Sequence, residues 1–267
     1  MTHRVFNFSP GPATLPLPVM QRVQEEFLDF QGMGASIVEI SHRSPEFEAL
    51  LGETDRLLRE ALEVPPGYKI LYCHGGGQMQ FSMVPLNLMG LKPAHKALYV
   101  DTGNFAARAA EEGARYGTAV VVASSKPSRY DHIPALDAAA LDPEASYLHI
   151  TTNNTVEGTR WQQFPRINGI PLVGDATSEI LGRVIDVGQF GLLYAAAQKN
   201  LGPPGLAVVL IREELLGHAH PLTPKLLDYT RLAREHSLTN TLNTFAVYTT
   251  KLVLEWLQAQ GGVAAME

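Results

Sequence analysis

A lysine at the end of an apolar run is the residue in this sequence best placed to act as a nucleophile. Lys199 follows the run 192–198 (LLYAAAQ) and precedes a Gly/Pro-rich turn at 200–205 (NLGPPG). Burial at a strand end lowers the pKa of a lysine, by up to roughly 3–5 units when burial is complete, and a neutral amine can condense with an aldehyde. A lone lysine there more often lies with its stem on apolar surface and its ammonium in water. The rigid turn after Lys199 and the acidic residue described next favour the chemical interpretation.

An aspartate closes the preceding apolar run. Asp175 ends the segment 170–175 (IPLVGD), where a carboxylate is costly unless a cation or several donors meet it. Taken alone, Asp175 serves equally well as the N-cap of a following helix. Together with Lys199 it predicts a partner for a protonated pyridine nitrogen, a contact that keeps the ring an electron sink.

Three glycines lie between an expected strand and an expected helix. Gly75, Gly76 and Gly77 permit close approach of the backbone, and the free N–H groups of the next helix form a cradle for a phosphate. Such turns also occur without any ligand. The preceding His74 makes a His-Gly-Gly-Gly sequence like the oxyanion loop of esterases, but the Gly-x-Ser-x-Gly elbow of that class is missing.

Composition narrows the class of protein. The 267 residues are 45% hydrophobic and 18% charged, which is typical of a globular chain with a sizeable core. The net charge of −6 argues against binding to nucleic acid or to an anionic membrane. Cys73 is the single cysteine, so we expect no disulfide and no metal site. The first residues lack the apolar core of a secretory signal, and we therefore expect a cytoplasmic protein.

The chemical residues need an alternating framework to position them. Seven short apolar runs are expected to be strands, at 68–74, 96–102, 118–123, 146–152, 170–176, 192–198 and 206–212. Helices are predicted from four-residue spacing of apolar side chains or from their place between strands, at 19–30, 45–62, 78–89, 104–116 and 241–259. We expect the last helix to leave the sheet.

This alternation predicts an α/β fold with a mainly parallel sheet. Only residues 200–205 separate the last two strands. A parallel crossover needs a dozen or more residues, so these two strands should be antiparallel neighbours.

Seven motifs, met in order along the chain, carry a resemblance to a known family. They are 7–12 (NFSPGP), 41–43 (SHR), 74–81 (HGGGQMQF), 99–103 (YVDTG), 154–158 (NTVEG), 175–178 (DATS) and 194–203 (YAAAQKNLGP). From residue 6 onward the chain resembles the phosphoserine aminotransferases of the class V pyridoxal-phosphate-dependent family. The resemblance implies an aspartate-aminotransferase-like (fold type I) large domain, with a seven-stranded, mainly parallel sheet that has one antiparallel strand and helices on both faces.

The resemblance also implies roles for individual residues toward pyridoxal 5'-phosphate. Lys199 would bind the cofactor covalently and move a proton, and Asp175 would pair with the pyridine nitrogen. Phe105 would stack on the ring, although it is otherwise an ordinary core aromatic. Thr155 would bond the ring hydroxyl, although a threonine in a polar loop is usually just solvated. The cofactor phosphate would be held by Gly77, Gln78, Ser178 and Gln198.

Four further residues are matched to roles that reach beyond this pocket. Asn240 and Thr241 would contact the phosphate in a neighbouring subunit, which implies a homodimer with shared sites; capping of the helix at 241–259 is another role, and both could hold. His42 and Arg43 would bind the phosphate of the substrate, or would simply be a polar loop before a helix. Gln78 departs from the family, because some relatives have an arginine there.

The resemblance implies a reaction and a domain plan. Glutamate would donate its amino group to 3-phosphohydroxypyruvate, giving O-phospho-L-serine in serine biosynthesis. We expect an N-terminal arm at 1–15, a cofactor-binding large domain at 16–255, and at 256–267 the start of a connection to a small domain. Relatives continue for about another hundred residues, including the arginine that binds the substrate carboxylate. Two alternatives are a non-catalytic cofactor-binding or dimerising fragment, and a relative that uses another amino donor such as serine or alanine.

Overall fold

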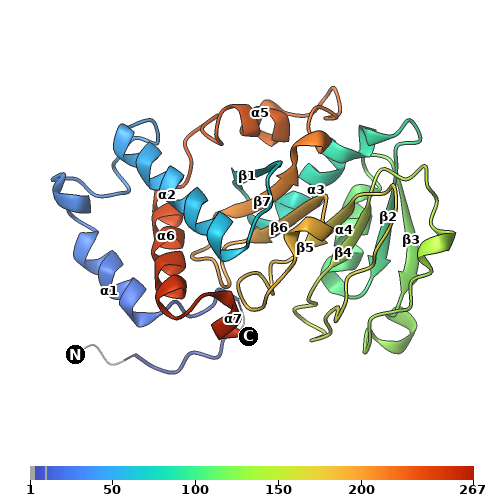
Figure 1. Ribbon diagram of the computed structural model, residues 1–267, viewed down its shortest axis with the longest axis horizontal. Coiled ribbons are helices and arrows are strands. Elements are labelled where there is room, and N and C mark those ends of the chain that lie inside the picture. Colours follow the sequence, from blue (N-terminus) through green and yellow to red (C-terminus); the bar gives the residue numbers. More distant parts are fainter. Residues whose placement is uncertain (1–3, 10) are drawn as a thin grey trace.

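A single seven-stranded sheet organises the chain in the computed structural model, which describes residues 4–9 and 11–267 (Figure 1). The spatial order is β1-β7-β6-β5-β4-β2-β3. The strands are β1 (Tyr68–Cys73), β2 (Lys96–Asp101), β3 (Thr118–Ser124), β4 (Leu148–Thr151), β5 (Leu172–Asp175), β6 (Leu192–Ala196) and β7 (Ala207–Arg212). All seven predicted runs form strands. Where the bounds differ, most observed strands end or begin one or two residues inside the predicted range.

Strand directions place six carboxyl ends at one edge of the sheet. Strand β7 is antiparallel to both of its neighbours, β1 and β6, whereas every other pair is parallel. The predicted antiparallel arrangement of the last two strands is confirmed. Since the six strands other than β7 consequently run the same way, the residues that follow them meet at a common edge.

Helices cover both faces of the sheet and define two cores. One face packs against α1 (Leu17–Glu26), α2 (Pro45–Ala61) and α6 (Thr244–Ala259), which lie together at one side of the molecule (Figure 1). The other face packs against α3 (Gly76–Leu88), α4 (Asn104–Gly113) and α5 (Tyr229–Arg234). The chain ends in the short helix α7 (Val263–Met266).

The bounds of three predicted helices differ most from the structure, and the one predicted at 104–116 ends at Gly113. The helix predicted at 19–30 ends at Glu26, and Phe27, expected on its buried face, is 41% exposed. The last predicted helix begins at Thr244 because the side chain of Asn243 accepts a hydrogen bond from the Ala246 N–H. It packs along α2, and its buried side chains belong to the same core cluster as side chains of α2 and of the sheet. The short helices α5 and α7 have too few turns to produce a visible apolar period.

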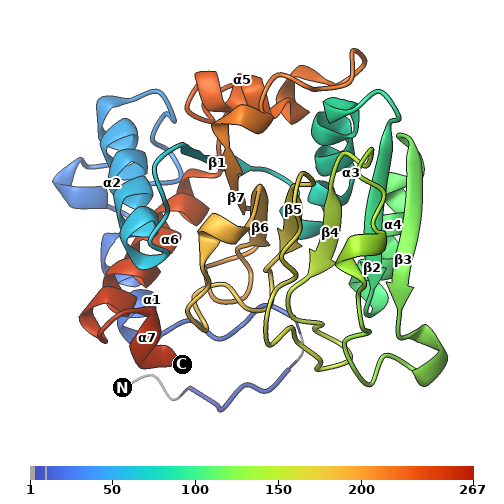
Figure 2. The same ribbon diagram turned by 45° about the vertical axis from the view of Figure 1, so that its right-hand side comes forward.

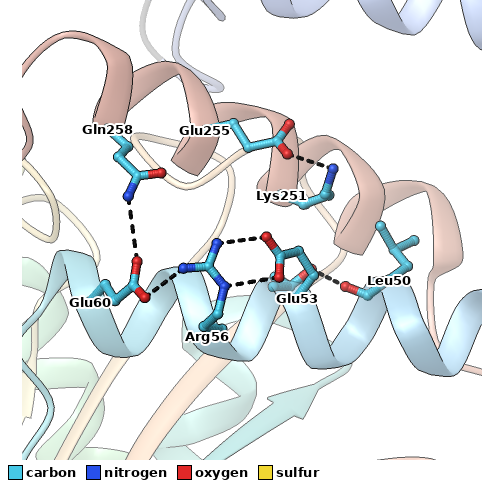
Figure 3. A network of polar contacts seen from close by, with 8 residues as sticks. Leu50, Glu53, Arg56, Glu60, Lys251, Glu255 and Gln258 are labelled. Carbon is cyan, nitrogen blue, oxygen red and sulfur yellow. Dashed lines mark hydrogen bonds and ion pairs between the residues drawn. The ribbon is translucent and has the colours of Figure 1, made fainter.

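Polar contacts line the solvent edge of the α2/α6 pair (Figure 3). Arg56 bridges Glu53 and Glu60 on α2, and the Gln258 amide of α6 donates to Glu60 across 3.4 Å. Exposed ion pairs of this kind contribute little to stability. The apolar faces of α2 and α6 therefore hold the two helices together. Among the helices of the described residues, none has the length and hydropathy to cross a membrane.

Candidate active site

A cavity of about 560 Å³ lies at the carboxyl edge of the sheet. This volume suits a small organic ligand. Eight of the predicted site residues line it: Gly77, Gln78, Phe105, Thr155, Asp175, Ser178, Gln198 and Lys199. The segment before α1, which passes below the strand ends in Figure 2, adds Gly11 and Pro12 to the wall. The shared edge of β1, β6, β5, β4 and β2 thus brings residues from distant parts of the chain to one place.

Lys199 is held at the cavity wall by two hydroxyl groups. It follows β6, is half-buried, and its Nζ donates to Thr155 Oγ1 at 2.7 Å and to Ser178 Oγ at 2.5 Å. Burial lowers the pKa of Lys199, and the charge of Asp175 opposes that shift. A lower pKa increases the share of neutral, nucleophilic amine.

Asp175 is buried where β5 ends. Its Oδ1 accepts a hydrogen bond from the Thr177 N–H at 3.0 Å. Burial raises the pKa of Asp175, while hydrogen bonds from Thr177, the charge of Lys199 and the Tyr194 hydroxyl act in the opposite direction. A carboxylate in this position is stabilised when a cation binds against it.

The amino end of α3 closes another side of the cavity. Gly75 has φ 83°, a left-handed conformation that suits glycine, and the helix begins directly after it. At Gly77 an added Cβ would lie 3.1 Å from Thr177 Oγ1 and 3.5 Å from Ala196 Cβ, so a glycine allows the helix to approach the strand ends. The predicted strand–glycine–helix arrangement is confirmed, and its free N–H groups face a site suited to an anion.

Glu157, which the sequence analysis did not identify, connects the loop and the helix that form two walls of the cavity. Glu157, in the loop that carries Thr155, accepts a hydrogen bond from the Asn104 N–H at 2.8 Å and so caps the helix that carries Phe105. Gly103 makes room for this contact, because a Cβ there would lie 2.4 Å from Glu157 Oε2. The two partners are far apart in sequence, so no local capping pattern points to Glu157.

Four predicted site residues lie outside the cavity lining. His42 is 8% exposed, and its Nε2 has no hydrogen-bond partner among the residues that the structure describes. Arg43 and Thr241 are exposed. The amide Nδ2 of Asn240 lies 3.3 Å from His74 Nε2, just before α3. The alternative role of Asn240 and Thr241 as helix caps is wrong, because Asn243 caps α6.

The side chains and backbone groups that line the cavity match the chemical groups of pyridoxal phosphate. An amine with a lowered pKa can bind its aldehyde, and a buried carboxylate can face its protonated ring nitrogen. A helix amino end can hold its phosphate, and Phe105 offers an aromatic face for its ring. Hydroxyl groups of Thr155 and Ser178, already within hydrogen-bond reach of Lys199, supply the remaining polar partners.

Known proteins resemble this chain along nearly its whole length. The sequence profile of the class-V aminotransferases (Aminotransferase class-V) matches residues 5–267. Phosphoserine aminotransferase of Bacillus cereus is 47% identical over 264 residues, covering 99% of this chain and 73% of the relative. The enzyme of the same name from Geobacillus kaustophilus is 48% identical, covering 99% of this chain and 72% of its own.

Solved structures agree with the sequence matches. Phosphoserine aminotransferase from Bacillus circulans subsp. alkalophilus superposes with a TM-score of 0.93 at 42% identity, covering 98% of this chain and 72% of the other. The phosphoserine aminotransferase of Trichomonas vaginalis, described with bound pyridoxal phosphate, gives 0.93 at 34% identity, with coverages of 98% and 73%. This chain, with its seven-stranded mixed sheet, therefore has the fold of these aminotransferases.

Proposed function

Because this chain belongs to the class-V aminotransferase family, we propose that it has phosphoserine aminotransferase activity. Glutamate gives its amino group and leaves as 2-oxoglutarate; 3-phosphohydroxypyruvate then receives that group and becomes O-phospho-L-serine, a step of serine biosynthesis. The observation that carries this proposal is the meeting of Lys199, Asp175 and the amino end of α3 in one cavity.

Lys199 is the proposed catalytic group. When bound, pyridoxal phosphate would supply an aldehyde carbon, which exchanges its oxygen for the amino group with release of water, and a ring that takes up the electrons of the breaking Cα–H bond. Lys199 Nζ would hold the cofactor through that carbon and, once the substrate amine has displaced it, would move the proton from the substrate Cα. Thr155 and Ser178 keep the amine pointing into the cavity, since both accept its hydrogen bonds.

The remaining cavity residues bind and orient. Asp175 would hold the proton at the ring nitrogen of the cofactor, whose positive charge would compensate the buried carboxylate. Gly77 and Gln78 at the start of α3, with Ser178 and Gln198, would hold the cofactor phosphate. Phe105 would stack on the ring and Thr155 would bond its hydroxyl.

We include a homodimer in the proposed function because four residues with expected phosphate-binding roles lie outside this chain's own cavity. Asn240, Thr241, His42 and Arg43 do not line this chain's cavity. If they bind the cofactor phosphate and the substrate phosphate, as the family motifs imply, they do so in a partner's cavity. We also propose a cytoplasmic location, which cell fractionation can test.

Trapping of the cofactor followed by peptide mapping tests whether Lys199 forms the covalent linkage. The chain is mixed with pyridoxal phosphate, the covalent linkage is trapped with borohydride, and peptide mapping locates the modified residue. We expect modification at Lys199, its loss in Lys199→Ala, and no change in Lys225→Ala, a control lysine away from the cavity. An adduct that persists in Lys199→Ala would contradict the assignment.

Half-reactions then separate the substrates. Glutamate should convert the bound cofactor to its amino form faster than serine or alanine does, and 3-phosphohydroxypyruvate should reverse the change faster than hydroxypyruvate. A spectrum unchanged by every amino acid would indicate a binding protein without transaminase activity. Faster conversion by serine or alanine would indicate another amino donor.

A further inference from the structure

Behind Asp175, a row of buried polar aromatic side chains shares one face of the sheet. The strand register pairs Asp175 with Tyr194 of β6, and His149 of β4 with Tyr99 of β2. Residues directly opposite each other on neighbouring strands point to the same side. This side is the one covered by α3 and α4, so the row lies in the interior and reaches the cavity only at Asp175.

His149 and Tyr194 form a hydrogen bond within this row. His149 Nε2 and the Tyr194 hydroxyl are 3.0 Å apart, and their rings are tilted by 38° with centroids 6.0 Å apart. Both side chains are at most 2% exposed. A buried polar pair of this kind is costly unless its members satisfy each other. A packing role alone would be served more simply by apolar side chains.

The direction of that bond follows from the other nitrogen of His149. Burial lowers the pKa of His149 to about 3, so the ring is neutral and carries one proton. Its Nδ1 is buried and has no hydrogen-bond partner in the described part of the chain. An unpaired buried acceptor is better tolerated than an unpaired donor. The proton is therefore placed on Nε2, which donates to the Tyr194 oxygen and leaves the Tyr194 O–H free to donate onward.

Asp175 is the acceptor toward which that O–H can turn. The groups that face Tyr194 are His149, Asp175, Tyr99 and, from α5, Tyr229. Asp175 is the only carboxyl in this set, and the strand register places it directly opposite Tyr194, on the same face of the sheet. The remaining neighbours are phenols, which are weaker acceptors than a carboxylate.

We propose that Tyr194, oriented by His149, is a positioning residue that donates a hydrogen bond to Asp175 and keeps this carboxylate ionised and aimed at the ring nitrogen of bound pyridoxal phosphate. The inference rests on the proposed function, because it needs a cofactor in the cavity. It assigns a task to two buried side chains that do not line the cavity.

The test uses the pH titration of the bound cofactor's absorbance in Tyr194→Phe. A less ionised Asp175 leaves the ring nitrogen less protonated, and the nitrogen that Lys199 contributes to the linkage then keeps its proton to higher pH. We expect the titration midpoint to rise by about one pH unit, the size expected for a lost hydrogen bond to a charged group. The signal of an isotope-labelled ring nitrogen should move toward its deprotonated position.

Tyr147→Phe is the matched control. It removes another fully buried hydroxyl, which bonds to Tyr99 at 2.6 Å, whereas the strand residue opposite Asp175 is Tyr194. It should lower the melting temperature about as much as Tyr194→Phe and leave the titration midpoint unchanged. If Tyr194→Phe does not fold, His149→Leu should raise the midpoint, and His149→Gln, which keeps a donor near Nε2, should restore it.

The outcomes are distinguishable. A folded Tyr194→Phe protein that binds the cofactor and titrates as the wild type does overturns this inference and leaves the proposed function intact. Equal midpoints in His149→Leu and His149→Gln would do the same. A wild-type chain that forms no linkage with pyridoxal phosphate overturns the proposed function and this inference with it.

Discussion

At the scale of single residues, Asp175 has opposite effects on function and on stability. It sits 6% exposed at the end of β5, with one backbone donor on Oδ1. Without a cation bound against it, the charged form is disfavoured by burial. The functional charge is therefore a source of instability in the protein without cofactor, as is common in active sites.

Asp175→Asn should stabilise the cofactor-free protein at neutral pH. Burial raises the pKa of Asp175 above its value in the unfolded chain, so stability from this group is complete below the unfolded pKa and is lost as pH rises through the folded pKa. The variant should melt at a higher temperature than wild type near pH 7, and this gain should vanish in acid. Its transamination rate should fall by about a hundredfold or more.

Melting curves over a range of pH, with and without pyridoxal phosphate, check this prediction. Saturation with the cofactor should reverse the order, because wild-type Asp175 then gains its cationic partner. A variant less stable than wild type at neutral pH without cofactor would show that the hydrogen bonds of Asp175 outweigh its burial.

At the scale of secondary-structure elements, the contact between Glu157 and α4 decides the shape of the cavity. It joins the loop that carries Thr155 to the helix that carries Phe105. A second contact acts in the same direction, since Thr102 Oγ1 donates to Asn154 Oδ1 at 2.9 Å. The loop is thus positioned by the end of β2 and the start of α4.

Gly103→Ala should weaken both folding and cofactor binding. The new Cβ would lie 2.4 Å from Glu157 Oε2, so the loop or the helix must move. Overpacking of this kind costs about 1–3 kcal/mol of unfolding free energy. Denaturant unfolding gives that loss, and titration with pyridoxal phosphate gives the accompanying loss of affinity.

Gly52→Ala is the control for this substitution. Gly52 lies exposed within α2, and an added Cβ there has no atom within 4 Å. Alanine should therefore stabilise that helix by about 0.5–1 kcal/mol and leave cofactor affinity unchanged. Equal effects of the two substitutions would contradict the role given to the Gly103 contact.

At the scale of the whole molecule, the proposed sharing of sites between two copies predicts complementation. Lys199→Ala and Arg43→Ala should each be inactive alone, the first for want of the amine and the second for want of a substrate-phosphate ligand. A mixed dimer contains one cavity with both residues intact. Mixing the two variants under conditions that exchange subunits should therefore restore part of the activity.

Light scattering during size-exclusion chromatography supplies the mass that this prediction needs. A mass of one chain, or a mixture that stays inactive although subunits exchange, would contradict shared sites. Mixing Lys199→Ala with Asp175→Asn is the control. Both changes fall in the same cavity lining, so the mixed dimer still lacks a complete site.

Local patterns in the sequence determined the strands, the principal helices and the chemistry at the strand ends. Apolar runs identified all seven strands, and the six residues at 200–205 were too few for a parallel crossover, so they fixed an antiparallel pair. Lys199, Asp175 and the glycines at the start of α3 were found because each follows or closes a strand. Their meeting in one cavity follows from the parallel direction of the strands.

Tertiary structure alone decided the contacts between distant segments. Glu157 caps a helix that begins 53 residues earlier in the chain. His149 of β4 reaches Tyr194 of β6 because β5 is the single strand between them in the sheet. Periodicity reports which face of an element is buried but does not identify the side chain opposite it. That identity depends on strand order and register, which the packing of the whole chain sets.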